Sequence, residues 1–233
     1  ARIAASYAGT RHVPSSSRGS MVVTGNPVRP EVLRYKDSSY SRPNENGTFN
    51  LLVFGGSQGA SIFSTLLPEA LYLLPREKLN RMRLVQQCRK DELASTLQAY
   101  GALGIDVELR DFFDDMPRRI MKSHLVISRS GATTISEMAV IGSPSLLVPL
   151  PQSIDQDQKT NALQLSNHEA AWVVDQKNLT PTKLAEMIGE FMENPLKLET
   201  AARAAKTRAI PQATENLVAF VETYAGYTNG IKI

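Results

Sequence analysis

The sequence has very little cysteine, since Cys88 is the only one among its 233 residues. A lone cysteine can form neither an intramolecular disulfide nor a cysteine-based zinc site, so a reducing cytoplasm is the simplest compartment for this chain. The sequence also has no apolar run near the ~20 residues that a membrane-spanning helix needs, and no signal peptide opens it. Any contact with a membrane is therefore expected to be peripheral.

A strong excess of charge is lacking as well. The 26 lysines and arginines against 23 aspartates and glutamates give a formal net charge of +3. This excess is too small to indicate nucleic-acid binding, and no nucleic-acid partner is expected. Hydrophobic residues make up 42% of the chain and charged residues 21%. Such a composition can bury a core in one or two domains.

Short apolar segments alternate with segments of helical periodicity along most of the chain. The segments predicted as strands are 49–54, 83–88, 107–109, 125–128, 145–148 and 171–174. Helical patterns include 62–74, 116–122, 133–141, 184–192 and 217–221. This alternation predicts an α/β fold with a doubly wound parallel sheet. Residues 35–48 are mostly polar and rich in turn formers, which is typical of a linker or an exposed loop.

The most informative motif is a hydroxyl-rich helix start that follows a predicted strand. Ser130-Gly131 ends the strand at 125–128, and a helical pattern begins at Thr133. Backbone N–H groups at such a helix start favour an anion. Glu137 falls about one turn inside the helix, where its carboxylate can accept two hydrogen bonds from a vicinal diol such as a ribose. The alternative is a glutamate that complements the helix dipole or caps the helix.

A second polar cluster follows the next predicted strand, 145–148. The loop at 153–158 offers carboxylate and amide side chains that suit sugar hydroxyls, although a solvated helix start would look similar. In an open parallel sheet, ligands bind beyond the carboxyl ends of the strands, so both clusters are predicted to face one crevice. A nucleotide-sugar site is the leading hypothesis.

A glycine-rich turn, FGGSQGA at 54–60, connects the first strand of the predicted sheet to the next helix. Gly55 and Gly56 let the backbone approach a diphosphate, and Ser57 offers its hydroxyl. The turn is neither a P-loop nor a full G-x-G-x-x-G fingerprint, and the acid expected about 20 residues after such a fingerprint is absent. A nicotinamide-dependent dehydrogenase is therefore a weak alternative, and a tight connection without a ligand is another.

Taken together, five motifs resemble the C-terminal half of the MurG family. They are TGNPVRPEV at 24–32, FGGSQGA at 54–60, DFFDDMP at 111–117, SGATTISE at 130–137 and D-x-x-Q-x-x-N-A at 155–162. Their order and spacing agree with that family over nearly the whole chain. The family transfers N-acetylglucosamine from UDP-N-acetylglucosamine to the undecaprenyl-pyrophosphoryl-muramoyl-pentapeptide precursor of peptidoglycan. Close alternatives are a non-catalytic nucleotide-sugar-binding module and a nucleotide-sugar epimerase of the same architecture.

The resemblance implies the C-terminal domain of a two-domain, GT-B type glycosyltransferase with Rossmann-like domains. Residues 1–34 are then a remnant of the acceptor domain with the interdomain connection, 49–224 the UDP-sugar donor-binding domain and 225–233 a tail. The first residues, ARIAASYAG, are similar to the last helix of the family's N-terminal domain. That domain, with most of the membrane contact and the expected catalytic base, is not contained in this sequence.

The resemblance implies an inverting, metal-independent transfer that uses no cofactor. No catalytic residue is expected in this chain, which is predicted to be inactive alone, and His12, His124 and His168 are interpreted as surface or packing residues. The family's location implies the bacterial cytoplasm, peripheral on the cytoplasmic face of the inner membrane. Asp114 and Asp115 are interpreted as charges at a helix start rather than a metal pair.

By resemblance, the residues that bind the donor share positions with the family's motifs. They are Arg29, Ser57, Gln58, Phe112, Phe113, Met116, Arg129, Thr133, Thr134, Ile135, Ser136, Glu137, Asp157, Gln158 and Asn161. Residues 112, 113 and 116 would form the uracil and ribose wall, with the Phe113 backbone pairing the base edge. Core packing is the alternative for Phe112. Arg29 would offer its guanidinium fork to uracil or phosphate, and a surface arginine is the alternative.

Each remaining group has an expected part in the same site. Ser57 and the helix start at 130–134 would stabilise the charge on the leaving diphosphate. Glu137 would hold the ribose diol. Asp157, Gln158 and Asn161 would address the sugar hydroxyls, although many relatives carry His or Gln at the first of these positions.

Overall fold

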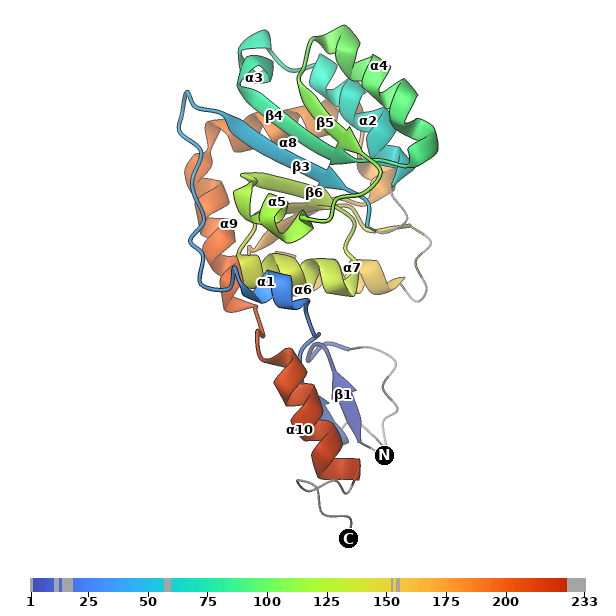
Figure 1. Ribbon diagram of the computed structural model, residues 1–233, viewed down its shortest axis with the longest axis vertical. Coiled ribbons are helices and arrows are strands. Elements are labelled where there is room, and N and C mark those ends of the chain that lie inside the picture. Colours follow the sequence, from blue (N-terminus) through green and yellow to red (C-terminus); the bar gives the residue numbers. More distant parts are fainter. Residues whose placement is uncertain are drawn as a thin grey trace.

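The computed structural model describes residues 2–10, 13, 19–56, 60–151, 153 and 156–225. Within them lie a six-stranded sheet flanked by helices and, at the other end of the elongated molecule, a small two-stranded sheet (Figure 1). The strands are β1 (Ile3–Ala5), β2 (Met21–Val23), β3 (Phe49–Phe54), β4 (Met82–Gln87), β5 (Val107–Arg110), β6 (Leu125–Ser128), β7 (Ser145–Leu147) and β8 (Ala171–Val173). Of the predicted tail, 225–233, all but the first residue lie outside the described residues.

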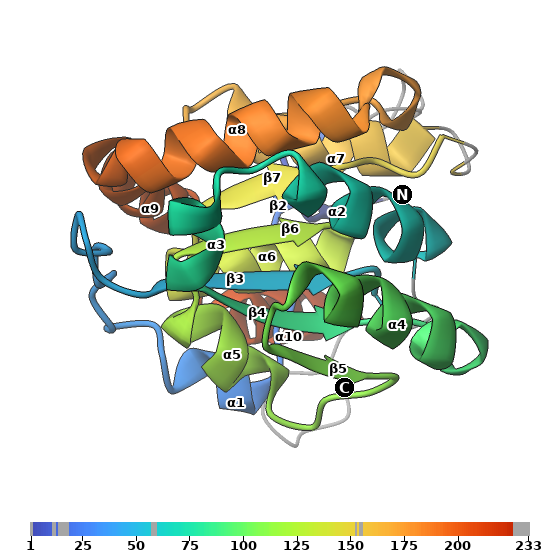
Figure 2. The ribbon, with the colours of Figure 1, turned by 90° about the horizontal axis from the view of Figure 1, so that it is seen from above.

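The large sheet is parallel throughout, and its strand order is β5-β4-β3-β6-β7-β8. Figure 2 shows β7, β6, β3, β4 and β5 following one another in this order. The direction of winding reverses at β3, where Leu51 is in register with Leu84 of β4 on one side and Leu125 of β6 on the other. The predicted doubly wound fold is confirmed. Its switch point, between the carboxyl ends of β3 and β6, is where such folds bind ligands.

Helices cover both faces of the large sheet. One face carries α2 (Ser61–Tyr72), α3 (Arg76–Arg81), α4 (Leu93–Leu103) and α8 (Pro181–Glu193). The other carries α1 (Pro30–Leu33), α5 (Met116–Lys122), α6 (Ala132–Ile141) and α7 (Asp157–Ser166). The helix α9 (Pro195–Thr207) contributes to both cores, and short 3-10 helices are η2 (Lys90–Glu92) and η4 (Gln176–Asn178).

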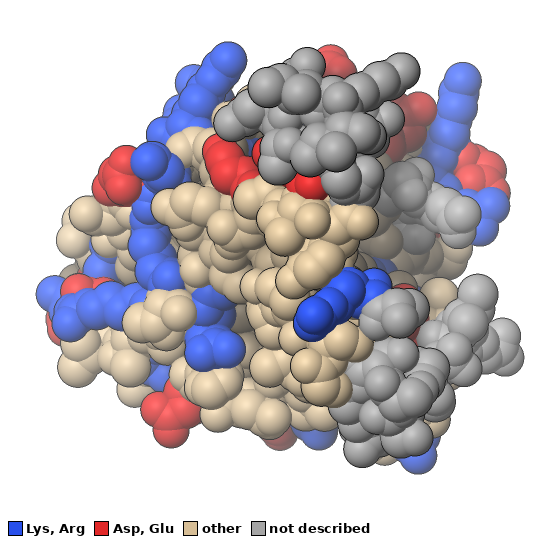
Figure 3. Space-filling model, turned by 90° about the horizontal axis from the view of Figure 1, so that it is seen from below, with Lys and Arg blue, Asp and Glu red and all other residues tan. Residues whose placement is uncertain are grey.

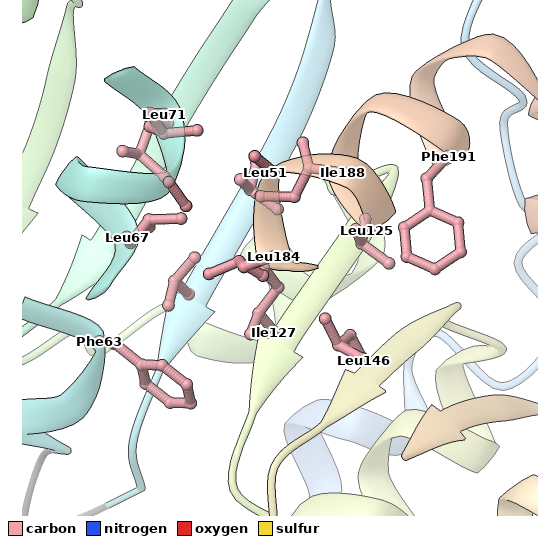
Figure 4. Packing of buried hydrophobic residues seen from close by; sticks show 14 of the residues in the cluster. Leu51, Phe63, Leu67, Leu71, Leu125, Ile127, Leu146, Leu184, Ile188 and Phe191 are labelled. Carbon is pink, nitrogen blue, oxygen red and sulfur yellow. The ribbon is translucent and has the colours of Figure 1, made fainter. Parts of the chain in front are cut away.

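Each central strand supplies side chains to both cores because successive residues point to opposite faces. On β3, Leu51 and Val53 belong to the core under α2 and α8, whereas Leu52 and Phe54 belong to the core under α5 and α6. Figure 4 shows the first of these cores, in which Phe63 and Leu67 of α2 and the α8 side chains meet the strands. Burial on both faces explains why these strands read as continuous apolar runs.

Several predicted elements can be compared with the structure residue by residue. Strands 49–54 and 125–128 and the helix 116–122 are confirmed residue for residue. Thr180 is the N-cap of α8, and its side-chain oxygen accepts a hydrogen bond from Lys183 N at 3.2 Å. The helices at 62–74, 133–141 and 184–192 are present with slightly shifted ends.

The expectation of a helix at the start of the chain is wrong. Ile3–Ala5 forms the strand β1, which pairs in parallel with β2. The partner strand lies eighteen residues further along the chain, with Ile3 opposite Met21, so the local sequence alone could not reveal the pairing. Alanine-rich segments favour helix in isolation, and a tertiary contact overrides this preference here.

The last helix, α10 (Ala213–Ala225), lies beside the small sheet rather than against the large one (Figure 1). Gly25 follows β2 with φ of +86°, and a Cβ there would come within 2.8 Å of Ala213. Asn216 Nδ2 donates a hydrogen bond to Thr24 O at 3.2 Å. In space, therefore, α10 belongs with the first residues of the chain, although it falls within the predicted domain 49–224.

Apolar side chains are exposed on this small unit. Val22 and Val23 of β2 and Val218, Val221 and Tyr224 of α10 are each about 40–50% exposed. Figure 3 looks at the molecule from this end: a largely uncharged surface lies in the middle of the view, with basic side chains on its left and one across it. No helix in the described part of the chain has the length and hydropathy to cross a membrane.

His124 holds β6 against β3. Its Nδ1 accepts a hydrogen bond from Asn50 N at 2.9 Å, and the backbone N–H of His124 donates to Asn50 O at 2.8 Å. Burial lowers the pKa of His124 below its usual 6.5. The interpretation as a packing residue agrees with these contacts, because an Nδ1 that accepts must be unprotonated.

This contact predicts a pH-dependent stability. Since the pKa of His124 is lower in the folded chain than in the unfolded one, the stability it contributes is complete above pH 6.5 and is lost as the pH falls through the lowered pKa. Replacing His124 with Asn, whose carbonyl can accept the same bond without titrating, should flatten this dependence. The check is the melting temperature of both proteins above and below pH 6.5. Identical pH slopes would contradict the assignment.

Candidate functional site

A cleft of about 1020 Å³ opens where the chain leaves the carboxyl ends of the central strands. Its lining comes from the turn after β3, the loop between β5 and α5, the start of α6 and the segments that follow β7 and β8. The predicted residues that line it are Arg29, Phe112, Phe113, Met116, Arg129, Thr133, Thr134, Glu137 and Gln158. The crevice therefore lies at the switch point of the sheet.

The glycine turn after β3 forms one wall. Gly55 and Gly56 line the cleft, and Gly56 has φ of +84°, with no atom of the described residues within 4 Å of where a Cβ would be. Only glycine adopts this backbone conformation without strain. Ser57 and Gln58, which were predicted to bind the donor, lie outside the described residues, as does Asp155.

The first turn of α6 faces the cleft. Gly131 is the N-cap and provides no side-chain cap, and Thr133 and Thr134 line the cleft. The first N–H groups of a helix have no partner within the helix, so they are available to an acceptor there. The geometry agrees with the predicted anion-binding helix start.

Glu137 lies in the second turn of α6, beyond the reach of a capping contact. Its side chain is only 6% exposed and forms a two-point ion pair with Arg29: Nε to Oε1 at 2.7 Å and Nη2 to Oε2 at 2.9 Å. The hydrogen bond with Glu137 raises the pKa of Arg29. The Arg29 guanidinium was expected to bind uracil or phosphate. In the structure its Nε and Nη2 donate to Glu137.

The pairing leaves Glu137 able to bind a ligand. Each carboxylate oxygen has two lone pairs, and Arg29 uses one on each. Arg29 itself is half-exposed and comes from the segment before α1, so the ion pair connects that segment to α6 at the cleft. A bidentate pair of this kind fixes the orientation of the carboxylate.

Arg129 is a buried cation in the cleft wall. Its Nη1 donates to the carbonyl oxygens of Val148 at 3.0 Å and Pro149 at 3.2 Å, and its Nη2 donates to Gln176 Oε1 at 2.7 Å. Burial lowers the pKa of Arg129. Among the described residues its hydrogen-bond partners are all neutral, and they hold the guanidinium in place beside the cleft.

The loop between β5 and α5 presents an aromatic wall. Phe113 is 4% exposed and Phe112 is 65% exposed, and both line the cleft together with Met116. Core packing, which was the alternative for Phe112, therefore does not apply. Asp115 is the N-cap of α5 as expected, but its side chain makes no capping bond and accepts one from Arg119 instead.

Three residues predicted to address the sugar make contacts within the protein that hold loops together. Gln158 Oε1 accepts from Leu150 N at 3.1 Å and Ser130 N at 3.3 Å. Asp157 Oδ1 accepts from the Gln158 backbone N, and Asn161 Nδ2 donates to Ser130 O. Of the three, only Gln158 lines the cleft, where its amide nitrogen is the group left for a ligand.

Ile135 and Ser136 are placed outside the cleft. Ile135 is 1% exposed within the core between the sheet and α6. The Ser136 hydroxyl makes a hydrogen bond with the Tyr7 hydroxyl at 2.7 Å, on the side of α6 that faces the start of the chain. A helix turns by 100° per residue, so neighbours of a ligand-facing residue point elsewhere.

Several lining residues were not predicted from the sequence. Gln87 ends β4, Leu150 and Pro151 follow β7, and Gln176 follows β8. Each one lies at or shortly after the carboxyl end of a strand. The rule that ligands bind beyond the carboxyl ends of parallel strands would therefore have indicated these residues too. In the described part of the chain, no group of three or more His, Cys, Asp or Glu side chains is arranged to hold a metal ion.

Comparison with known proteins identifies the family. Residues 50–217 match the family model described as glycosyltransferase family 28 C-terminal domain. The chain belongs to this family. The match extends over β3 to α10 and so contains most of the cleft.

Curated relatives carry the name UDP-N-acetylglucosamine–N-acetylmuramyl-(pentapeptide) pyrophosphoryl-undecaprenol N-acetylglucosamine transferase. The protein of Brucella suis (strain ATCC 23445 / NCTC 10510) is 46% identical over 88% of this chain and 54% of its own length. That of Methylorubrum populi is 42% identical over 97% of this chain and 62% of its own. The chain thus spans between half and two thirds of these relatives.

A solved structure gives the same relationship. The crystal structure of Acinetobacter baumannii MurG superposes with a TM-score of 0.77 at 27% identity, covering 95% of this chain and 60% of that one. Together with the C-terminal family domain, these relatives confirm the resemblance to the C-terminal half of MurG and the GT-B type fold.

Proposed function

We propose that this chain supplies the donor site of an N-acetylglucosamine transferase that acts in peptidoglycan synthesis. The donor is UDP-N-acetylglucosamine, and the acceptor is the undecaprenyl-pyrophosphoryl-muramoyl-pentapeptide. The observation that supports this most is that one cleft at the switch point holds a fixed cation, Arg129, a helix start and the carboxylate of Glu137. These are the groups that a nucleoside diphosphate needs.

Each group has a part in binding the donor. The N–H groups at the start of α6 and the guanidinium of Arg129 face the diphosphate, and the free lone pairs of Glu137 accept from the ribose hydroxyls. Phe113 and Phe112 line the base pocket. The Gln158 amide nitrogen addresses the sugar.

The reaction is an inverting transfer. A base outside this chain removes the proton from the acceptor hydroxyl, whose oxygen attacks the anomeric carbon as the bond to UDP breaks. Negative charge then grows on the leaving diphosphate, and Arg129 and the α6 start stabilise it without rearranging. No metal ion or other cofactor takes part. The enzyme works peripherally on the cytoplasmic face of the bacterial inner membrane, and it uses no nucleic-acid partner.

Calorimetric titration tests the proposal directly. The chain should bind UDP and UDP-N-acetylglucosamine in the presence of a chelator, with one site per chain, and should not bind NAD. Binding of NAD alone would favour the dehydrogenase alternative, and a strict magnesium requirement would contradict the metal-free mechanism. A nucleotide-sugar epimerase is separated by incubating the chain with UDP-N-acetylglucosamine and looking for the epimer, which we expect to be absent.

A further inference from the structure

Four charged side chains bracket the loop between β5 and α5, and the proposed reaction uses none of them. Glu108 and Arg110 lie on β5, before the loop. Asp115 and Arg119 lie at the N-cap and on the second turn of α5, after it. The loop between them carries Phe112 and Phe113, which line the cleft.

Arg119 connects the residues before the loop with those after it. Its Nη1 and Nη2 donate to the two carboxylate oxygens of Glu108 at 2.7 and 2.9 Å, and its Nε donates to Asp115 Oδ1 at 2.6 Å. Arg110 binds the same Glu108 at 2.9 Å. All three guanidinium nitrogens of Arg119 are engaged, and its side chain is only 17% exposed. A two-point contact of this kind fixes the plane of the guanidinium as well as its position.

The guanidinium also stacks on the cleft wall. The central carbon of Arg119 lies 4.1 Å from the centroid of the Phe113 ring, and that of Arg110 lies 5.7 Å from it. Phe113 is buried and lines the cleft. The charged side chains therefore contact the ring of Phe113, which lines the cleft. The interaction between a cation and the face of an aromatic ring is attractive.

A stabilising role alone does not account for this arrangement. Ion pairs that are open to water contribute little to folding, and Glu108 and Asp115 are each about 40% exposed. The hydrogen bond from Arg119 is the largest cause that lowers the pKa of Glu108. These contacts instead fix the conformation of the loop, because they hold the residues at both of its ends and the ring of Phe113 between them.

We propose that Arg119 is a positioning residue that sets selectivity for the nucleobase. By clamping Glu108 and Asp115 and stacking on Phe113, it holds the loop at 111–114 in the one conformation that pairs with the edge of uracil. This inference rests on the proposed function, because it requires that the cleft bind a uridine nucleotide.

Comparison of UDP with CDP isolates the base. The two ligands share the ribose and the diphosphate, and they differ only at the base edge, where uracil has a donor and an acceptor in the places in which cytosine has an acceptor and a donor. The variant is Arg119→Met, which keeps much of the side chain's length and removes its charge and donors. The matched control is Arg118→Met, on the same helix, because Arg118 is exposed and its guanidinium forms none of the ion pairs found in the described part of the chain.

Calorimetry should show that the unaltered chain prefers UDP over CDP. The Arg119→Met chain should lose this preference by about tenfold, in line with a coupling effect of this class. Glu108→Gln should act in the same direction, Arg119→Lys should restore part of the preference, and Arg118→Met should leave it unchanged. Hydrogen exchange at residues 110–115 should rise in Arg119→Met and in Glu108→Gln, and it should stay unchanged in Arg118→Met.

The outcomes separate the inference from the function on which it rests. If Arg119→Met and Glu108→Gln keep the full preference for UDP, the inference is wrong, whether or not their melting temperatures fall. If either variant fails to fold, the other and Arg119→Lys decide. An unaltered chain that binds neither UDP nor UDP-N-acetylglucosamine would overturn the proposed function itself. One that binds UDP and CDP equally would overturn only the inference.

Discussion

Replacement of Glu137 by alanine is expected to weaken UDP binding by roughly 1.5–3 kcal/mol, which is a ten- to hundredfold change in Kd. The carboxylate is only 6% exposed and is oriented by the two contacts to Arg29. It can therefore accept both ribose hydroxyls without reorganising, and hydrogen bonds to a charged group are the stronger kind. Alanine removes these acceptors and leaves the half-exposed Arg29 in water.

Matched variants separate ligand binding from folding. Ser136→Ala changes the neighbouring residue of α6, whose hydroxyl bonds Tyr7 outside the cleft, and it should leave the Kd for UDP unchanged. Arg29→Met removes the group that orients Glu137 but keeps the carboxylate, and it should weaken UDP less than Glu137→Ala. A Glu137→Ala protein with unchanged affinity and a lowered melting temperature would show that the carboxylate serves the fold alone.

The second large effect concerns the transfer reaction. This chain alone should give no detectable transfer of N-acetylglucosamine, however well it binds the donor. Inverting attack needs the acceptor and a base on the face of the sugar opposite the leaving UDP, and the cleft described here is the donor side. Loss of positioning alone removes ~7–11 kcal/mol of barrier lowering.

The histidines of the chain support this expectation. His124 Nδ1 accepts a hydrogen bond from the backbone N–H of Asn50 on β3, so this nitrogen is not free to act as a base. His168 is exposed in the turn after α7 and is not part of the cleft lining, and His12 lies outside the described residues. The assay is incubation with UDP-N-acetylglucosamine and the lipid-linked acceptor, with a full-length relative as the positive control. Product formation at a rate near that of the relative would place a base within this chain.

Local patterns were sufficient for much of the fold. The strands β3 and β6 are buried on both faces and flanked by turn residues, so their apolar runs marked their ends in the sequence. The strand β1 was missed because its alanine-rich segment favours a helix locally, whereas the strand depends on pairing with β2 eighteen residues further along the chain. The strands β7 and β8 are equally short and were predicted, because their apolar runs are flanked by turn residues.

The site was predictable at the level of motifs and not of contacts. A strand end followed by a helix start indicated Glu137, and the family resemblance indicated Arg129 and Phe113. The topology of a parallel sheet brings these segments together. The ion pair between Arg29 and Glu137 joins residues 108 positions apart, and no local pattern predicts it. The bond from Arg129 to Gln176 is of the same kind.

The most direct test of the account is a crystal structure of this chain with UDP bound. We expect both ribose hydroxyls within hydrogen-bonding distance of the Glu137 carboxylate, the diphosphate against the start of α6 and Arg129, and the uracil beside Phe113. UDP bound at another surface, or bound in the cleft with the ribose turned away from Glu137, would contradict the account.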